Sequence, residues 1–388
     1  MTAVWQDMTL GDLEHAAGGV IQTGPFGSQL HTSDYSSCGT PVVMPTNIRD
    51  LRIDATDIAR VGSQHVDRLS RHVLQPGDII YSRRGDVEKC ALVTPDESGW
   101  LCGTGCLLVR IKGINPRYLA YALSLPATRA WIARHAIGAT MPNLNTNILR
   151  EVPITIPDRG TQDAIATTLG AIDDKIDSNR QVGKKCLTLA RAWVHKETEG
   201  TNLEPLDNVA LVRMGAAFSG ASFAAPGTGR PLLRIRDLKT GSPQVWTTET
   251  RSDEAVILPG DIVVGMDAEF HATLWMGAPS VLNQRVCSFA GCQGVSRAFI
   301  LAALEPPLAW YEQAKTGTTV IHLNKADIDR FMVPRLTIAK HEALAAITEP
   351  LIDRAVTCAK EAQVLAALRD TLLPELLSGR IRADISVR

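Results

Sequence analysis

The sequence repeats itself once, and this duplication constrains the fold more than any other feature. Residues 76–80 (PGDII) return about 180 residues later as residues 259–263 (PGDIV). Other matches keep the same order and similar offsets: IRDL at 48–51 and 235–238, GAT at 138–140 and GTT at 317–319, LN at 144–145 and 323–324, and VP at 152–153 and 333–334. Solenoid units have periods of roughly 20–50 residues, so this longer period indicates a duplicated domain. We therefore predict two similar domains with two similar binding surfaces.

The composition is that of an ordinary soluble globular protein. The chain has 388 residues, of which 45% are hydrophobic and 21% are charged, and this length gives room for two or three domains. Its first residues lack the basic start and apolar run of a signal peptide. No stretch approaches about 18 consecutive apolar residues, the length that a membrane span needs. We expect a cytoplasmic protein that does not enter a membrane.

The charge balance excludes a strongly basic nucleic-acid binder. The net charge is −1; residues 1–158 hold 14 Lys and Arg against 15 Asp and Glu, and residues 201–337 hold 12 against 13. Any DNA-binding face must therefore be a local patch, and its modest phosphate affinity would need help from a partner. The eight cysteines form no C-x-x-C pair and the nine histidines show no ligand spacing. We expect reduced core cysteines, no metal site and no cofactor.

The residue pattern within each copy predicts a mixed domain followed by a long helix. Short β-type runs at 41–44, 78–81, 91–93 and 107–111 are punctuated by Gly and Pro. Helices are expected over 116–125 and 126–136, and a strand bounded by prolines closes the domain at 152–157. The second copy repeats this order up to residue 336. The predicted fold class is α+β.

After each copy the apolar period changes to that of a helix. The first stripe contains Ile165, Leu169, Ile172 and Ile176, and the second contains Leu344, Leu351, Leu365 and Leu372. The first helix is expected to run from Thr161 to about Lys196, roughly 36 residues or about 54 Å. The two helices can bury their stripes against each other as an antiparallel pair. The alternative, that each helix packs on its own domain, stays open.

Two loops of the first copy carry groups suited to binding phosphate or bases. Residues 24–28 (GPFGS), with Gly24, Phe26 and Ser28, form a tight loop that can offer backbone N–H groups to phosphate, and can equally be only a turn. Arg83 and Arg84 follow a strand, and Arg is the side chain best shaped to contact guanine edges or phosphate. The alternative is that these arginines are solvated or paired with nearby acids.

Further candidates come from the loops at the corresponding places of both copies. They are Asn47 and Arg49, Thr140 and Asn143 in the first copy, and Arg234, Arg236, Lys239, Thr318 and Thr319 in the second. All are polar side chains that follow a strand or precede the closing strand. We predict that DNA is contacted by these loops.

Catalytic signatures are missing from the sequence. It contains no phosphate-binding G-x-x-x-x-G-K-[ST] loop, no H-E-x-x-H and no G-x-S-x-G turn. Residues 115–118 (NPRY) resemble the Asn-Pro-Pro-Tyr loop of adenine methyltransferases, but Arg117 breaks that pattern. A helix start is the better interpretation of this segment.

The whole chain resembles the specificity subunits of type I restriction-modification systems. The segments that carry the resemblance are TGPFGSQL at 23–30, GTPVV at 39–43, PGDI at 76–79, GATMPNLN at 138–145 and LRDTLLPELLSGRI at 368–381. The second copy departs from the first, with GMD at 265–267 in place of the double arginine. The resemblance therefore implies that the two domains contact different bases.

The resemblance also implies an architecture and partners. Target-recognition domains at 1–158 and 201–337 would be separated by spacer helices at 159–200 and 338–388, which form an antiparallel, pseudo-twofold coiled coil. Each domain would recognise one half of a split sequence in double-stranded DNA. The helices would dock two methyltransferase subunits, and the motor-endonuclease subunits would join that complex. The chain itself would be non-catalytic. An interaction scaffold without DNA contact and, more remotely, an adenine methyltransferase are the alternatives.

Overall fold

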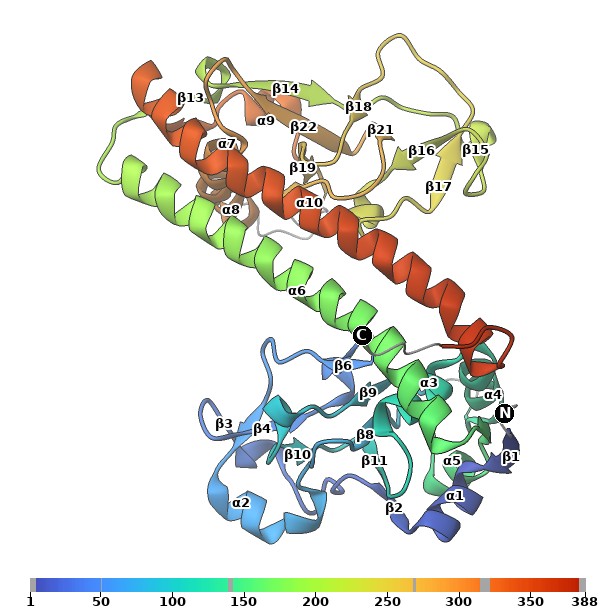
Figure 1. Cartoon of the computed structure of the whole chain (residues 1–388). Coiled ribbons are helices and arrows are strands. Elements are labelled where there is room, and N and C mark those ends of the chain that lie inside the picture. Colours follow the sequence, from blue (N-terminus) through green and yellow to red (C-terminus); the bar gives the residue numbers. More distant parts are fainter. Residues whose placement is uncertain (1–4, 50, 139–141, 268–269, 315–321, 384–388) are drawn as a thin grey trace. The chain divides into compact units, whose positions relative to one another are not determined.

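The computed structural model describes residues 5–49, 51–138, 142–267, 270–314 and 322–383 (Figure 1). Its contacts divide the chain into two compact units. Unit 1 comprises residues 1–173 and 367–388, and unit 2 comprises residues 174–366. Both units combine small β-sheets with helices, so the chain has the predicted α+β fold.

Within its described residues, unit 1 contains two four-stranded sheets. The strands are β1 (Gln6–Thr9), β2 (Gly19–Thr23), β3 (Tyr35–Ser36), β4 (Thr40–Val43), β5 (Ile48–Arg49), β6 (Arg52–Ile53), β7 (Arg60–Val61), β8 (Ile79–Ser82), β9 (Cys90–Leu92), β10 (Leu101–Cys102), β11 (Cys106–Ile111) and β12 (Pro153–Ile156). One sheet has the antiparallel order β2-β11-β8-β9. The other has the order β10-β4-β7-β3, in which β10 and β4 run parallel. The pairs β1-β12 and β5-β6 complete the unit.

The strands β8 and β11 are buried on both faces because their side chains alternate between two cores. Leu107 and Val109 belong to a cluster with Tyr118 of helix α3 (Pro116–Ser124). Leu108 belongs to a separate cluster with Ile80. This period of two is the geometry of a strand, and it explains the nearly continuous apolar run of β11. The other helices of unit 1 are α1 (Leu10–Ala17), α2 (Ser63–Arg68), α4 (Pro126–His135) and α5 (Thr146–Arg150).

Unit 2 repeats this topology. Its strands are β13 (Leu203–Pro205), β14 (Ala210–Met214), β15 (Phe223–Ala224), β16 (Arg230–Leu233), β17 (Val245–Thr247), β18 (Val256–Ile257), β19 (Ile262–Gly265), β20 (Ala272–Leu274), β21 (Ser280–Leu282), β22 (Val286–Gly291) and β23 (Met332–Pro334), and its short helices are α7 (Arg297–Ala303), α8 (Glu305–Ala314) and α9 (Lys325–Ile328). The order β14-β22-β19-β20 matches β2-β11-β8-β9, and the parallel pair β16-β21 matches β4-β10. The predicted domain duplication is confirmed.

One of the sequence matches behind that prediction is wrong by three residues. The IRDL segments at 48–51 and 235–238 do not occupy equivalent positions. The residue equivalent to Asp237 is Asn47, since their side chains make the same hydrogen bond. Asn47 Oδ1 accepts the backbone N–H of Met44 at 2.9 Å, and Asp237 Oδ2 accepts that of Arg234 at 3.0 Å. Both bonds close a short 3₁₀ turn directly after the equivalent strands β4 and β16. The matching letters therefore arose by chance.

Two helices of 40 residues each, α6 (Arg159–Thr198) and α10 (Ile338–Leu377), belong to both units along their length. α6 begins after Asp158, whose carboxylate accepts the backbone N–H of Thr161 at 3.1 Å. Each helix therefore starts and ends in a different unit. The α6 helix is longer than the 36 residues that the apolar pattern predicts, because it extends beyond the pattern from Thr161 back to Arg159 and from Lys196 on to Thr198.

The helices pack both on each other and on the sheets. Within unit 2, Asn179 donates to Glu361 at 3.0 Å and Lys340 lies 4.0 Å from Glu197, which is the register of an antiparallel pair. Both helices also contribute to the hydrophobic cores. Leu169 lies in the core of unit 1, and Leu344 lies in that of unit 2.

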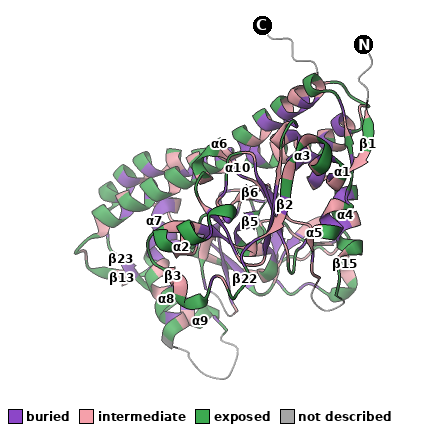
Figure 2. Cartoon of the chain, turned by 90° about the horizontal axis from the view of Figure 1, so that it is seen from below, coloured by how far each residue is buried: buried purple, intermediate pink, exposed green. Residues whose placement is uncertain are grey.

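The strands of both units are more buried than the two long helices. Figure 2 shows buried residues on the strands of the central sheets, whereas α6 and α10 carry exposed residues along much of their length. The cysteines are free, and the buried ones are Cys90, Cys102, Cys106, Cys287 and Cys358. Among the described residues, no helix has the length and apolarity to cross a membrane.

Gly24, in the loop that follows β2, packs closely against the backbone of Gly103. A Cβ added at Gly24 would lie 2.1 Å from the carbonyl oxygen of Gly103, whereas one added at Gly27 would meet no atom within 4 Å. We expect Gly24→Ala to lower the free energy of unfolding by about 1–3 kcal/mol, because a backbone must move. Gly27→Ala, in the same loop, should change it by less than about 0.5 kcal/mol. Urea unfolding measures both, and equal stability of the two variants would contradict this packing.

Candidate nucleic-acid interface

In unit 1, the candidate loops meet where the strand pair β8-β11 ends. The backbone N–H of Arg83 donates to the carbonyl of Gly105 at 2.8 Å, and the carbonyl of Arg83 accepts the N–H of Leu144 at 2.9 Å. Arg84 and Asn143 then form an isolated antiparallel bridge. The structure therefore brings Asn143 next to Arg83 and Arg84, although it lies about 60 residues further along the sequence.

Unit 2 has the same backbone arrangement with different side chains. The N–H of Met266 donates to Arg285 at 3.0 Å, and the carbonyl of Met266 accepts the N–H of Leu323 at 2.9 Å. Asp267 and His322 form the corresponding bridge. Asp267 thus occupies the position of Arg84, and His322 that of Asn143.

A concave surface with several cationic side chains lies beside this junction in unit 1. The cavity has a volume of about 690 Å³ and is lined by Pro45, Thr46, Ile48, Arg49, Ser82, Arg84, Gly85, Asp86 and Lys89. The Arg49 side chain is 69% exposed, with Nε 3.4 Å from Asp54 Oδ2, and Lys89 is paired with Asp86. Within the described part of the chain, Arg84 makes no ion pair. Arg49, Arg84 and Lys89 outnumber Asp86 on the lining, so this surface is locally cationic although Arg49 and Lys89 are paired with carboxylates.

The loop at 24–28 contributes an aromatic ring to this region. Phe26 is 49% exposed, and the guanidinium carbon of Arg83 lies 5.7 Å from the ring centroid, which is within cation–π range. The Nε atom of Arg83 and the Oδ1 atom of Asn143 are buried and have no hydrogen-bond partner among the described residues. A buried polar atom without a partner costs about 1–3 kcal/mol, so these two atoms are unusual features of this region.

Backbone N–H groups of the same loop are already engaged. The N–H of Gly24 donates to Cys106 at 2.8 Å, and that of Phe26 donates to Gln29 Oε1 at 3.1 Å. These two groups are therefore not free to bind phosphate, and the exposed residues Gly27 and Ser28 remain for that role.

Asn47 has a structural part in this unit. It is only 6% exposed, its Oδ1 closes the turn after β4, and its Nδ2 donates to the carbonyl of Asp54 at 3.0 Å. Both polar ends of the amide are used inside the fold. We therefore leave Asn47 out of the interface that we propose. The candidates Thr140, Thr318 and Thr319 lie outside the described residues.

The candidates of unit 2 divide in the same way. Arg234 is largely buried, and its Nε lies 3.3 Å from Asp237 Oδ2. This guanidinium therefore pairs with the carboxylate that closes the turn after β16. Arg236 and Lys239 are exposed. Sequence analysis missed Arg285 and His322, whose nitrogens lie 3.7 Å and 2.6 Å from Asp267 Oδ1. The repeat register was the signal that could have found them, since it aligns them with Gly105 and Asn143.

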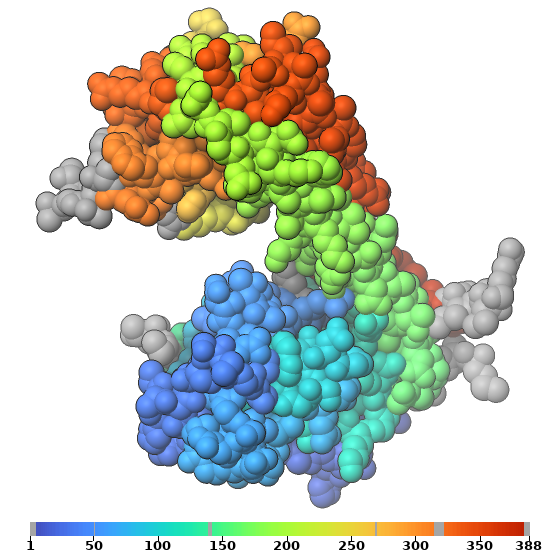
Figure 3. Space-filling view, turned by 90° about the vertical axis from the view of Figure 1, so that its left-hand side faces the viewer, coloured from blue at the N-terminus to red at the C-terminus, as the bar shows by residue number. Residues whose placement is uncertain are grey.

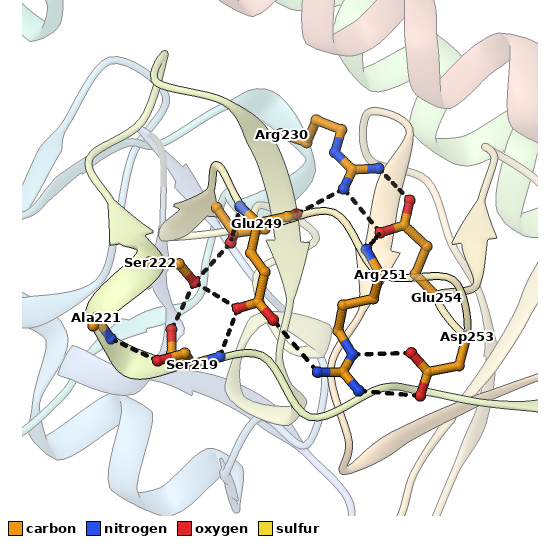
Figure 4. A network of polar contacts seen from close by, with 9 residues as sticks. Ser219, Ala221, Ser222, Arg230, Glu249, Arg251, Asp253 and Glu254 are labelled. Carbon is orange, nitrogen blue, oxygen red and sulfur yellow. Dashed lines mark hydrogen bonds and ion pairs between the residues drawn. The ribbon is translucent and has the colours of Figure 1, made fainter.

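A network of ion pairs fixes the loop of unit 2 that corresponds to residues 24–28 (Figure 4). Glu249 Oε2 accepts the N–H of Ser219 at 2.8 Å and the hydroxyl of Ser222 at 3.0 Å. Arg251 bridges Glu249 and Asp253. The Arg251 charge is therefore neutralised within the chain and contributes little to an anionic ligand.

Arg230 and Glu254 belong to the same network and form its second ion pair. They form a two-pronged ion pair with nitrogen–oxygen distances of 2.5 and 2.9 Å, and Arg230 also donates to the carbonyl of Glu249 at 2.8 Å. This guanidinium, helped by the backbone N–H of Arg251, lowers the pKa of Glu254 from 4.5 to about 2. Glu254 is therefore ionised at neutral pH.

The stripe residues proposed for subunit docking mostly face the chain's own interior. Ile165, Leu169, Ile176 and Leu344 are buried, and Ile172, Leu351, Leu365 and Leu372 are half-buried. A partner would instead meet the exposed apolar side chains of the helices, which are Leu189, Ile338, Ile347, Val364 and Leu368. Figure 3 shows that α6 (green) and α10 (orange to red) both present side chains at the surface.

The segment that resembles a methyltransferase loop is a helix start. Asn115 Oδ1 accepts the N–H groups of Arg117 and Tyr118 at 3.0 and 3.1 Å, and Pro116 occupies the first turn of α3. The amide is thereby occupied, and the helix-start interpretation is confirmed.

Comparison with known proteins identifies relatives of the chain. Residues 5–185 match the family model of the type I restriction modification DNA specificity domain. The type I restriction enzyme EcoBI specificity subunit of Escherichia coli is 28% identical over 184 residues, which is 46% of this chain and 39% of that protein. The type I restriction enzyme MjaIX specificity subunit of Methanocaldococcus jannaschii is 21% identical over 309 residues, which is 70% of each chain.

One solved structure is similar along nearly the whole chain. The S subunit of a type I restriction-modification system from M. genitalium superposes with a TM-score of 0.62 at 14% identity, covering 97% of this chain and 96% of that one. At this identity the likeness shows the fold alone. The alignment with the E. coli protein spans less than half of that protein's length.

The pKa of Glu254 gives a pH-dependent prediction. Because the folded pKa is below the unfolded value, the stabilisation by this carboxylate is complete above pH 4.5 and is lost as the pH falls through about 2. We expect Glu254→Gln to lower the free energy of unfolding by about 1 kcal/mol at pH 7, since the pair is partly solvated. The difference from the wild type should shrink between pH 4.5 and pH 3.

Urea unfolding at pH 7 and pH 3 measures this effect. Asp253→Asn is the control, because that carboxylate is 61% exposed and its loss leaves the Arg230 pair intact. A Glu254→Gln penalty that is the same at both pH values would contradict the assignment.

Proposed function

We propose that this chain, whose residues 5–185 belong to the type I restriction-modification DNA specificity family, is the non-catalytic subunit that recognises double-stranded DNA in a type I restriction-modification complex. The observation that carries the proposal is the coincidence of that family segment with the cationic concave surface of unit 1. Arg49 and Arg84 lie there at the ends of strands, exposed and able to donate to phosphates or base edges.

Each unit recognises one half of a two-part target in this proposal. The support is the repeated topology, which places Arg84 and Asp267 at equivalent junctions. Opposite charges at equivalent positions select different bases, so the two halves of the target differ. Arg236, Lys239 and Arg285 are the exposed cations of unit 2 that take part.

The long helices dock two methyltransferase subunits, and the motor-endonuclease subunits join through that complex. The support is the set of exposed apolar side chains on α6 and α10, beside stripe residues that the chain itself buries. Partner subunits would also supply phosphate contacts, which the net charge of −1 requires for tight binding.

The leading alternative is an interaction scaffold that makes no contact with DNA. In this alternative the cationic surface of unit 1 does not bind DNA. Reversing the charge of Arg83 and Arg84 would leave a scaffold's activity unchanged, whereas the proposed subunit would bind DNA more weakly.

Mapping of adenine methylation tests the proposal. In cells that express the chain with a cognate methyltransferase subunit, we expect methylation at a two-part sequence with a fixed unspecified gap. Deletion of this chain should abolish it. An unchanged methylome after deletion, with a methyltransferase of verified activity, would favour the scaffold.

The docking surface has its own test. Val364 is 63% exposed on α10, and Val364→Glu should weaken co-purification with the methyltransferase subunit about tenfold or more, because a charge is desolvated in an apolar contact. Val364→Thr, which keeps the shape of the side chain and adds no charge, should have a smaller effect. Circular dichroism verifies that the helices persist. Equal binding by both variants would place the docking surface elsewhere.

A further inference from the structure

Equivalent positions in the two units carry opposite charges. Arg84 follows β8, and Asp267 follows β19, each as the second residue after the strand. Each forms an isolated bridge, with Asn143 and His322 respectively, and the residue before it makes the same two backbone hydrogen bonds. The backbone is therefore shared, and the side chain alone changes the chemistry of the site.

In unit 1 this position presents hydrogen-bond donors. Arg84 is exposed, lines the cavity of about 690 Å³ and has no ion-pair partner among the residues that the structure describes. On the adjoining residues, Arg83 Nε and Asn143 Oδ1 are buried and have no hydrogen-bond partner within the described part of the chain. The exposed guanidinium of Arg84 can donate two parallel hydrogen bonds to a ligand that carries two acceptor atoms on one edge.

In unit 2 the position presents an acceptor. The Asp267 side chain is 23% exposed, and its Oδ1 atom faces His322 Nδ1 at 2.6 Å and Arg285 Nη1 at 3.7 Å. These two contacts orient the carboxylate through one oxygen. A carboxylate has about four acceptor sites, so one that is oriented in this way can still accept a hydrogen bond from a ligand.

We propose that residues 84 and 267 are the paired specificity-determining residues of the two half-sites. Arg84 donates to the N7 and O6 atoms of a guanine, which is the base edge that matches a guanidinium. Asp267 accepts from the exocyclic amine of a cytosine, and it excludes guanine and thymine at that position because their carbonyl oxygens are also acceptors. This inference rests on the proposed function.

Single substitutions at the two positions test it. Methylomes are mapped for the wild type, Arg84→Ala and Asp267→Asn, each with the cognate methyltransferase subunit. Arg84→Ala should lose discrimination on the order of tenfold to a hundredfold at one guanine of the half-site that unit 1 recognises, and leave the other half unchanged. Asp267→Asn should relax one cytosine in the opposite half, since an amide can also donate to a carbonyl oxygen.

Matched controls separate a base contact from a general loss of charge. Arg159→Ala removes an exposed arginine at the start of α6, and Asp329→Asn neutralises an exposed carboxylate after α9. Neither should change either half of the motif. Replacing the assigned guanine by 7-deazaguanine, which lacks N7, should weaken DNA binding by the wild-type complex and have no effect on the Arg84→Ala complex.

The outcomes are distinguishable. A wild-type methylome without a two-part motif would refute the proposed function itself. A normal wild-type motif that both variants retain would overturn this inference and leave the function standing. Arg84→Ala binding that weakens equally on all sequences, with a salt dependence reduced by about one phosphate contact, would show that Arg84 binds the backbone and would also overturn it.

Discussion

The candidate interface of each unit depends on a pair of backbone hydrogen bonds at the end of the central strand pair. In each unit, one residue after the strand donates its N–H to the neighbouring turn and accepts the N–H of the loop that precedes the closing strand. Because only backbone atoms make these bonds, the side chains at positions 83, 84, 266 and 267 are free to vary. The fold thereby holds two loops and a strand end together without fixing the chemistry that they present.

The long helices have a second structural function besides any contact with partners. Each one buries apolar residues in the core of unit 1 near one end and in that of unit 2 near the other. Leu169 and Leu344 are therefore unavailable to another protein, although both lie on the helices for which the family resemblance implies docking. A helix that completes the chain's own cores keeps only its outer face for a partner, and that face carries Val364 and Leu368.

Comparing the two units shows why matched letters and matched positions are different things. The PGD segments and the LN pairs identify equivalent positions, because they close turns and cap helices in both units. The IRDL segments do not, since Asn47 takes the place of Asp237. A polar side chain that closes the same turn can be an amide in one copy and a carboxylate in the other, so the alignment of letters missed it.

The sequence by itself determined the duplication, the α+β class, the two long helices and the set of polar candidates, because period, composition and turn residues are local properties of a chain. Only the tertiary structure decided which candidates can act. The N–H of Gly24 is engaged by the carbonyl of Cys106, about 80 residues away, and Asn47 and Arg234 bond to residues within the turns that follow β4 and β16, whereas Arg84 and Arg236 are exposed. Whether a side chain turns toward a partner in the chain or toward solvent depends on the folded backbone, so Arg234 and Arg236, which are two positions apart, look alike in the sequence.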